Sequence, residues 1–265
     1  MRWNELEAGL RRHASLGILD TYGEVEDPKG RYPLLRLRTA GGALCVITAG
    51  FHGDEQSGPI SLMEHLPEVI DYARANDVAL AVYPCLNPSG FDAFSRYNRN
   101  GEKPNNWFID YELPDGRVIG ELREIVPYTR TLLRTVGPAE TRALIAEMER
   151  LPATPVGALD LHQDPYFDGH LAYAYAFGDP GPYIDLINRS ERIVPIARSH
   201  EVDDHTHSDE HGLVYFHDGS VTDYFMRRGT AYTAVVETTT DTDMALACQV
   251  NLVWMRGFID LCARV

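Results

Sequence analysis

The sequence predicts one large α/β domain, and three observations carry this prediction. A chain of 265 residues, 44% hydrophobic and 24% charged, can bury a sizeable core as a single domain. Three apolar runs, residues 43–49, 78–83 and 156–161, have the continuous pattern of strands buried on both faces of a sheet. Each run ends in polar residues, and in open α/β sheets ligands bind at the carboxyl ends of the strands. We therefore expect residues 1–265 to form one catalytic domain with its chemistry at that edge.

The elements before and after the first buried run follow from hydrophobic spacing and turn residues. Residues 4–14 look helical, and two strand-like runs follow at 17–25 and 32–39, the second after the turn signal Asp27-Pro-Lys-Gly30. Helical spacing returns at residues 60–74.

The second half of the chain alternates further helices and strands with two long polar segments. Residues 92–116 are too long and polar for an idle connection, and long loops of this kind are usually functional. We expect one or two amphipathic helices over 119–150, split near Gly137-Pro138. The remaining expected elements are strands over 172–177, 193–197 and 232–236, and helices over 220–227 and 243–264.

The charge and composition exclude several classes of function. A net charge of −15 and a pI near 5.0 argue against nucleic acid or an anionic membrane as partner, because phosphate binding needs clustered Lys and Arg. No stretch of about 18 apolar residues occurs, and the N-terminus lacks the apolar core of a signal peptide, so we expect a cytoplasmic protein without a membrane span. The four cysteines lie far apart and are expected to be buried free thiols.

Three residues at the strand ends suit a zinc ion. His52 and Glu55 stand three apart in a glycine-flanked turn after a buried strand, and His162 ends another strand at the same expected edge. Catalytic zinc takes about three His or carboxylate ligands and keeps a position open for water. An isolated His and Glu near a helix N-terminus more often cap or pair with neighbours, so this spacing alone is a weak signal.

Several short motifs resemble those of the zinc carboxypeptidase family in their order and spacing, from about residue 49 to residue 237. His52-Gly-Asp-Glu55 and Leu161-His162 are similar to its metal ligands, and Glu237 matches its general base. The other matching positions are Asn87-Pro-Ser-Gly-Phe91, the pair Arg96 and Arg99, Tyr215 at the place of a mobile tyrosine, and Gly219-Ser-Val-Thr-Asp223-Tyr224.

The resemblance implies a three-layer α/β/α domain with a mixed, mostly parallel central sheet. It also implies one zinc per chain on His52, Glu55 and His162, a metal that makes its bound water acidic enough for a carboxylate such as Glu237 to deprotonate. Arg99 is the expected oxyanion group, with Arg96 as second choice in a substrate-binding role. Tyr215 completes the expected catalytic set, and Asp160 or Asp164 would orient a ligand histidine.

One departure from the family concerns the substrate. Many carboxypeptidases carry an Asn-Arg pair whose arginine grips the terminal carboxylate of the peptide, but here the stretch contains Asn105 and Asn106 and no arginine. The expected substrate is a peptide or amide, with an N-acyl amino acid as the alternative. Two alternative functions remain. One is the deacylation of N-acyl amino acids, as in the relatives aspartoacylase and succinylglutamate desuccinylase, and the other is the trimming of cell-wall peptides. A second cation opposite the oxyanion arginine would favour a substrate with a carboxylate.

Two further alternatives concern a protein without activity and a second metal site. A binding protein that has lost activity is disfavoured because the three metal ligands and Glu237 are present together. The acidic, His-rich segment 199–211 contains His200, His205, His207 and His211, which could form a second metal site. We favour an exposed loop with incidental histidines, one that could overhang the site because it leads to Tyr215.

Overall fold

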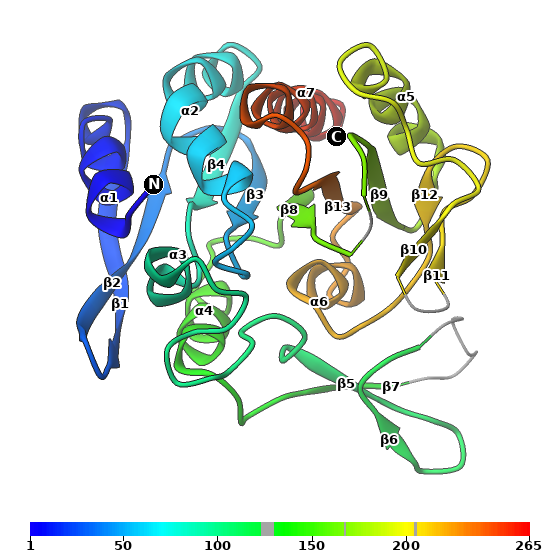
Figure 1. Ribbon diagram of the computed structural model, residues 1–265, viewed down its shortest axis with the longest axis horizontal. Helices are drawn as coiled ribbons and strands as arrows, with labels where there is room; N and C mark the ends of the chain where they lie inside the picture. The colour runs from blue at the N-terminus through cyan, green and yellow to red at the C-terminus, as the bar shows by residue number, and fades with distance from the viewer. Residues whose placement is uncertain (123–129, 167, 204–205) are drawn as a thin grey trace.

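An eight-stranded mixed sheet forms the centre of the molecule (Figure 1). The computed structural model describes residues 1–122, 130–166, 168–203 and 206–265. The four central strands, β4, β3, β8 and β13, are mutually parallel. In spatial order the strands are β1 (Ile18–Asp27), β2 (Gly30–Arg38), β4 (Val78–Tyr83), β3 (Ala43–Ala49), β8 (Gly157–Asp164), β13 (Tyr232–Thr239), β9 (Ala172–Phe177) and β12 (Leu213–Val214).

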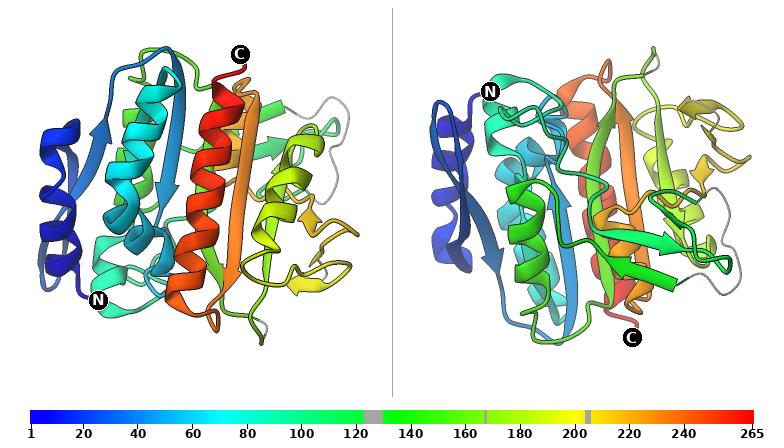
Figure 2. Two further views of the ribbon diagram at one scale, coloured as in Figure 1. Left: turned by 90° about the horizontal axis from the view of Figure 1, so that it is seen from above. Right: turned by 90° about the horizontal axis from the view of Figure 1, so that it is seen from below.

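Helices cover both faces of this sheet. Figure 2 shows α1 (Trp3–Arg11), α2 (Ser57–Ala75), α7 (Met244–Cys262) and α5 (Gly181–Ser190) side by side on one face. The other face carries α4 (Ala139–Met148), α6 (Val221–Arg227) and a small sheet of β6 (Val118–Ile119), β5 (Ile109–Glu112) and β7 (Arg130–Leu133). The short elements are η1 (Ala14–Leu16), α3 (Pro88–Ala93), β10 (Glu201–Asp203) and β11 (Thr206–His207).

Two apolar layers hold the sandwich together. One lies between the sheet and the helices α2, α5 and α7, and includes Leu62, Trp254 and Phe258. The other lies between the sheet and the helices α4 and α6, and includes Leu144 and Tyr224. Because β3, β4 and β8 are covered on both faces, their sequences are continuous apolar runs, which is why the chain alone identifies them.

The structure confirms the expected α/β fold with a mixed, mostly parallel sheet between helical layers. The expected strands 43–49, 78–83 and 172–177 coincide with β3, β4 and β9. The cysteines are free and buried, as expected. In the described ranges no helix has the length and apolarity to cross a membrane.

Three expectations of secondary structure are wrong. Residues 119–150 were expected to be helical, but helix occupies only α4, whereas β6 and β7 pair with β5, and residues 123–129 lie outside the described ones. Residues 193–197 make one isolated bridge, between Ile196 and Ala172, and no strand. The polar stretch 92–116 contains β5, and α5 was not expected at all. The strands of this small sheet have only two to four residues, too few for a strand pattern to stand out from spacing alone.

The His-rich segment forms the small β10–β11 hairpin. His200 and His207 are exposed on it, while His205 lies outside the described residues. The expected loop therefore contains two short paired strands, and among the described residues no metal-binding group includes its histidines.

Candidate metal centre and active site

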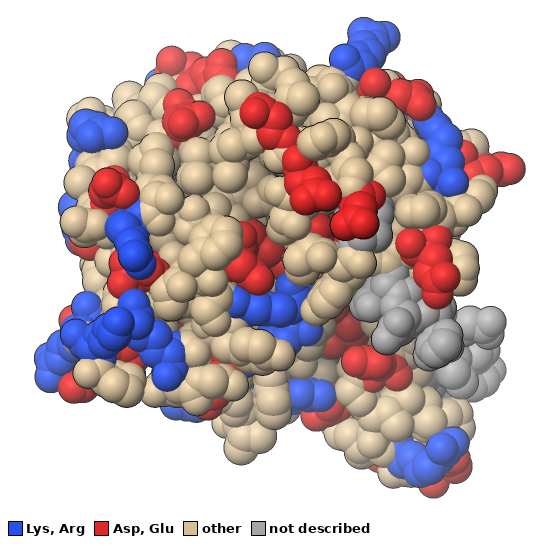
Figure 3. All heavy atoms as spheres, viewed as in Figure 1, with Lys and Arg blue, Asp and Glu red and all other residues tan. Residues whose placement is uncertain are grey.

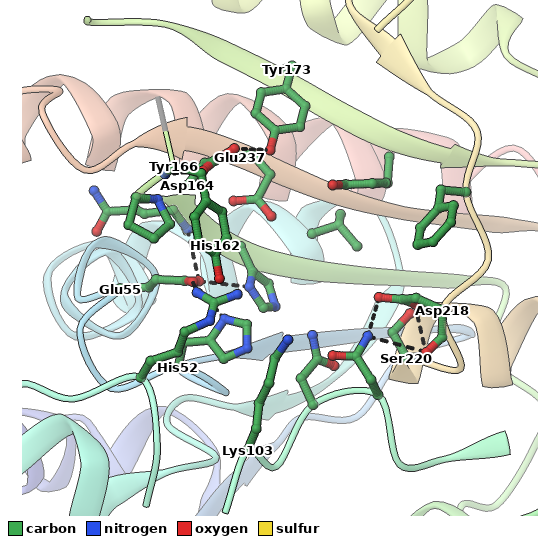
Figure 4. Close-up of a pocket in the computed structure, with 18 of the residues that line it drawn as sticks. His52, Glu55, Lys103, His162, Asp164, Tyr166, Tyr173, Asp218, Ser220 and Glu237 are labelled. Atoms are coloured by element: carbon green, nitrogen blue, oxygen red, sulfur yellow. Dashed lines mark hydrogen bonds and ion pairs between the residues drawn. The ribbon is translucent and has the colours of Figure 1, made fainter. Parts of the chain in front are cut away.

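The parallel strands bring the predicted site residues to one edge of the sheet. His52 follows the end of β3, and His162 lies near the end of the neighbouring strand β8. In the register of β8 and β13, Glu237 stands directly opposite His162. Figure 4 shows His52, Glu55, His162 and Glu237 turned toward one cavity.

Close backbone packing fixes the turn that carries His52 and Glu55. Gly53 lies against Gly90, so that a Cβ built on Gly53 would stand 1.9 Å from the Gly90 carbonyl carbon. Asn87 caps α3 by accepting from the Gly90 N–H at 2.9 Å, and its Nδ2 donates to the Phe51 carbonyl at 3.2 Å. The Asn-Pro turn after β4 thereby braces the turn after β3, which explains why both segments contain glycine.

His52, Glu55 and His162 form a buried cluster whose ligand atoms lie within 4.8 Å of one another. The Nδ1 of His52 faces Glu55 Oε1 at 2.6 Å, and the Nδ1 of His162 faces Glu55 Oε2 at 2.8 Å. Each of these nitrogen–oxygen pairs brings lone pairs toward one another, so a proton or a cation is needed between the two atoms. Two imidazoles and one carboxylate are a usual donor set for catalytic zinc, so these residues fit the metal.

The orientation of His162 is fixed from behind. Its Nε2 lies 2.8 Å from Asp160 Oδ2, and Thr48 donates its hydroxyl to Asp160 Oδ1 at 2.8 Å. A carboxylate on the far nitrogen selects the tautomer that leaves Nδ1 available to a metal. Burial alone would lower the pKa of His162, but the carboxylates of Asp160 and Glu55 outweigh it and raise that pKa well above its ordinary value.

The other two members of the cluster have the charge states that a metal needs. Burial lowers the pKa of His52 to about 4, although the charge of Glu55 opposes this, so the imidazole is neutral near pH 7. Burial would raise the pKa of Glu55, but His52 and His162 lower it well below the ordinary glutamate value. A neutral imidazole and an ionised carboxylate both have lone pairs for a metal ion.

Glu237 sits beside this cluster, opposite His162 in the register of the two strands. Its Oε2 is buried and makes no hydrogen bond to the described residues. Burial raises the pKa of Glu237 well above the ordinary glutamate value, Glu55 and Asp164 add to this, and His162 and Arg96 oppose it. A carboxylate with a raised pKa beside a metal cluster suits proton transfer near neutral pH.

The cluster opens into a cavity of about 220 Å³. Figure 3 shows acidic and basic side chains gathered where this face is hollowed between α3 and α6. The lining includes the cluster and Glu237, the cations Arg96 and Lys103, and the polar residues Asn105, Asn106, Tyr166, Tyr173, Tyr175, Asp164, Glu121, Asp218 and Ser220.

Known structures share this architecture over nearly the whole chain. A candidate metallopeptidase from Shewanella baltica is 24% identical, with a TM-score of 0.77 over 98% of this chain and 92% of that one. Bovine thrombin-activatable fibrinolysis inhibitor, in a complex with tick carboxypeptidase inhibitor, is 14% identical, with a TM-score of 0.68 over 100% and 97%. A metallo-carboxypeptidase from Pseudomonas aeruginosa is 15% identical, with a TM-score of 0.63 over 96% and 67%.

The chain has a carboxypeptidase-like fold. No protein-family model matches the sequence, and no curated protein matches it. At these identities the likeness shows the fold, and the function has to be argued from the site.

Within the carboxypeptidase-like fold, the two arginines stand differently from the expectation. Arg99 pairs with Asp92 at 2.8 Å and with Asp27 at 3.2 Å, and it is not among the described residues that line the cavity. Arg96 does line it, donates from Nη1 to Glu55 Oε1 at 2.6 Å, and lies 5.0 Å from the Tyr166 ring centre. Arg96, and not Arg99, therefore lies next to the cluster of His52, Glu55 and His162. Arg99 is held elsewhere by two carboxylates.

Tyr215 also stands outside the cavity. It is exposed, and its hydroxyl donates to Asp209 at 3.1 Å. The tyrosines that do line the cavity are Tyr166, after β8, and Tyr173 and Tyr175 on β9. The alternating sequence AYAYAF of β9 could have revealed the latter pair, because residues two apart share a face of a strand.

The expected substrate-binding asparagines and Asp164 lie in the cavity, together with three charged residues that were not expected there. Asn105, Asn106 and Asp164 line it, and the Tyr173 hydroxyl donates to Asp164 at 2.5 Å. Lys103, Glu121 and Asp218 are the additional charged residues. Lys103 could have been found from its place two residues before the asparagine pair, whereas Asp218 precedes Gly219-Ser220 and carries no distinctive spacing.

Proposed function

We propose that this protein is a zinc-dependent hydrolase of a peptide or amide bond, with His52, Glu55 and His162 holding the metal. The observation that supports this proposal most directly is the buried cluster of these residues with Glu237 in register beside it, whose buried Oε2 makes no hydrogen bond to the described residues. A bound zinc ion supplies a Lewis acid and makes water acidic enough to attack an amide carbonyl near neutral pH.

The protein's own groups have separate parts in this proposal. Glu237 accepts a proton from the attacking water and passes it to the leaving nitrogen as the carbon–nitrogen bond breaks. Arg96, held beside the cluster by Glu55, donates to the carbonyl oxygen as negative charge develops on it. Burial of the cluster excludes bulk water and strengthens both interactions.

A deacylase of N-acyl amino acids is the second candidate, and Lys103 favours it. The lysine lines the same cavity as Arg96, so the site contains two cations. Figure 4 shows the Lys103 side chain rising into the cavity beside His52. An ammonium group can bind a substrate carboxylate as a point charge, without the bidentate geometry of an arginine.

The test compares the zinc-loaded wild type with Glu237→Gln on peptides and N-acyl amino acids. We expect Glu237→Gln to lower kcat/KM by about 10²-fold or more while zinc stays bound, since only proton transfer is removed. Glu26→Gln, an exposed strand residue, is the matched control and should keep wild-type rates. Equal activity of Glu237→Gln and wild type would overturn the assigned role.

A further inference from the structure

The end of the cavity away from the metal cluster is built around Asp218. Its Oδ1 accepts from the Ser220 N–H at 3.0 Å, and its Oδ2 accepts from Asn106 Nδ2. The same Nδ2 group also reaches the Asp218 carbonyl at 3.3 Å. Figure 4 shows Asp218 and Ser220 across the cavity from His52, Glu55 and His162.

This wall has the opposite polarity to a carboxylate-binding site. Asn106 stands in the stretch where many carboxypeptidases carry an arginine, but its Nδ2 is directed at acceptors of Asp218. Its orientation is fixed because both neighbours are acceptors, and the buried Oδ1 has no partner among the described residues. Asn106 therefore presents no donor to a substrate carboxylate, and Asp218 adds a carboxylate of the protein at the same place.

Acidic side chains outnumber basic ones in the lining of the cavity. The carboxylates that line it are Glu55, Glu121, Asp164, Asp218 and Glu237, against the cations Arg96 and Lys103. Burial raises the pKa of Asp218, whereas Ser220, Lys103 and Asn106 oppose this and favour its ionised form. Asp218 lines the cavity and is half-buried as a residue.

We propose that Asp218 binds a primary ammonium group on the leaving portion of the substrate. This inference rests on the proposed hydrolase, and it narrows the substrate class to amides whose amine portion carries a second amino group. The ammonium group would donate to the Asp218 carboxylate, a charge-assisted hydrogen bond. Lys103 lines the same cavity and its charge acts on Asp218, so the contribution of each charged group to binding has to be measured separately.

A set of four compounds separates the two contributions. One acyl group, N-acetylalanyl, is joined to lysine (through its α-amino group), norleucine, 1,5-diaminopentane or pentylamine. The lysine and norleucine compounds differ only in the ammonium group, as do the diaminopentane and pentylamine compounds. The lysine and diaminopentane compounds differ only in the carboxylate, as do the norleucine and pentylamine compounds. Binding is measured by calorimetry on zinc-loaded Glu237→Gln, which prevents turnover, and kcat/KM is measured on the wild type.

We expect the ammonium group to raise affinity about tenfold, with or without the carboxylate. Asp218→Asn, which keeps an acceptor for the Ser220 N–H, should abolish this gain, while Asp115→Asn on the exposed β5–β6 turn should keep it. Asn106→Arg is a second variant, expected to replace the ammonium gain by a gain for the carboxylate. Zinc content measures whether each variant is folded.

Three results would overturn the inference: no ammonium gain, a gain that persists in Asp218→Asn, or no binding by any of the four compounds. If Lys103→Met removes a carboxylate gain and the ammonium gain is absent, the lysine alone sets specificity and the role of Asp218 is wrong. If the ammonium gain is present and depends on Asp218 but no compound is hydrolysed by the wild type, the proposed hydrolase fails while the ammonium site stands.

Discussion

At the scale of single residues, the site depends on how each side chain is held by its neighbour. Asp160 accepts from His162 on the side away from the cluster, and Thr48 in turn donates to Asp160. Removal of a carboxylate that holds a metal-binding histidine typically lowers metal affinity by about 10- to 100-fold. The charge state of His162 follows from the same contacts.

Zinc binding is predicted to release about one proton near pH 7. The pKa of His162 is raised by Asp160 and Glu55 against the effect of burial, so this imidazole is protonated before the metal binds. Raising the pH removes the competing proton, and zinc affinity should rise about tenfold per pH unit until the pH passes that pKa. Calorimetric titration in buffers of different ionisation enthalpy measures the proton.

Asp160→Asn is the control for this prediction. Without the carboxylate the pKa of His162 falls, so fewer protons should be released when zinc binds. Zinc affinity should drop by about 10- to 100-fold. Unchanged proton release in Asp160→Asn would show that another group is the one that loses its proton.

The arginines and tyrosines show what residue identity alone could not predict. Arg96 and Arg99 lie three apart in one polar segment, and only the ion pairs with Asp92 and Asp27 reveal that Arg99 is held away from the cavity. The spacing of Tyr215 suggested a catalytic tyrosine, but its hydroxyl is bound to Asp209. Side-chain direction in a loop depends on partners far along the chain, which one sequence does not show.

At the scale of elements, the turns after the parallel strands carry the chemistry. The strands β3, β4 and β8 were predictable because burial on both faces leaves a continuous apolar pattern. The small sheet β5–β7 was not, because its strands have only two to four residues and are exposed in part. The candidate metal-binding residues could be named because they follow strands that could be identified and because their order and spacing resemble those of the zinc carboxypeptidase family.

Gly53→Ala is predicted to disrupt the turn that carries His52 and Glu55. The new methyl group would overlap the Gly90 backbone, and overpacking of this kind costs about 1–3 kcal/mol or more. Urea unfolding should show the loss of stability, and zinc affinity should fall with it. Gly181→Ala is the control, since its Cβ meets only Asp179 at an ordinary 3.4 Å, and it should leave both quantities near wild type.

At the scale of the whole molecule, the metal is expected to add to the stability of the fold. The ligands come from two separate strand ends, so the site exists only when β3 and β8 are paired. A ligand that binds only the folded state at about 1,000 times its Kd stabilises it by about 4 kcal/mol. For a chain of this size that corresponds to a shift in Tm of roughly 10 °C.

Removal of zinc by a chelator should therefore lower the Tm of the wild type by about this amount, and added zinc should restore it. His162→Ala should show the lower Tm with and without the chelator, because it lacks a ligand. A wild-type Tm that does not respond to chelation would mean that no metal links the two strand ends.

The most direct test of the central claim is the zinc content of purified protein, measured by elemental analysis after loading and removal of excess metal. The account predicts about one zinc per chain in the wild type and in Glu237→Gln, and almost none in His52→Ala or His162→Ala. A wild type that holds no zinc after loading, or a His162→Ala variant that holds as much as the wild type, would contradict it.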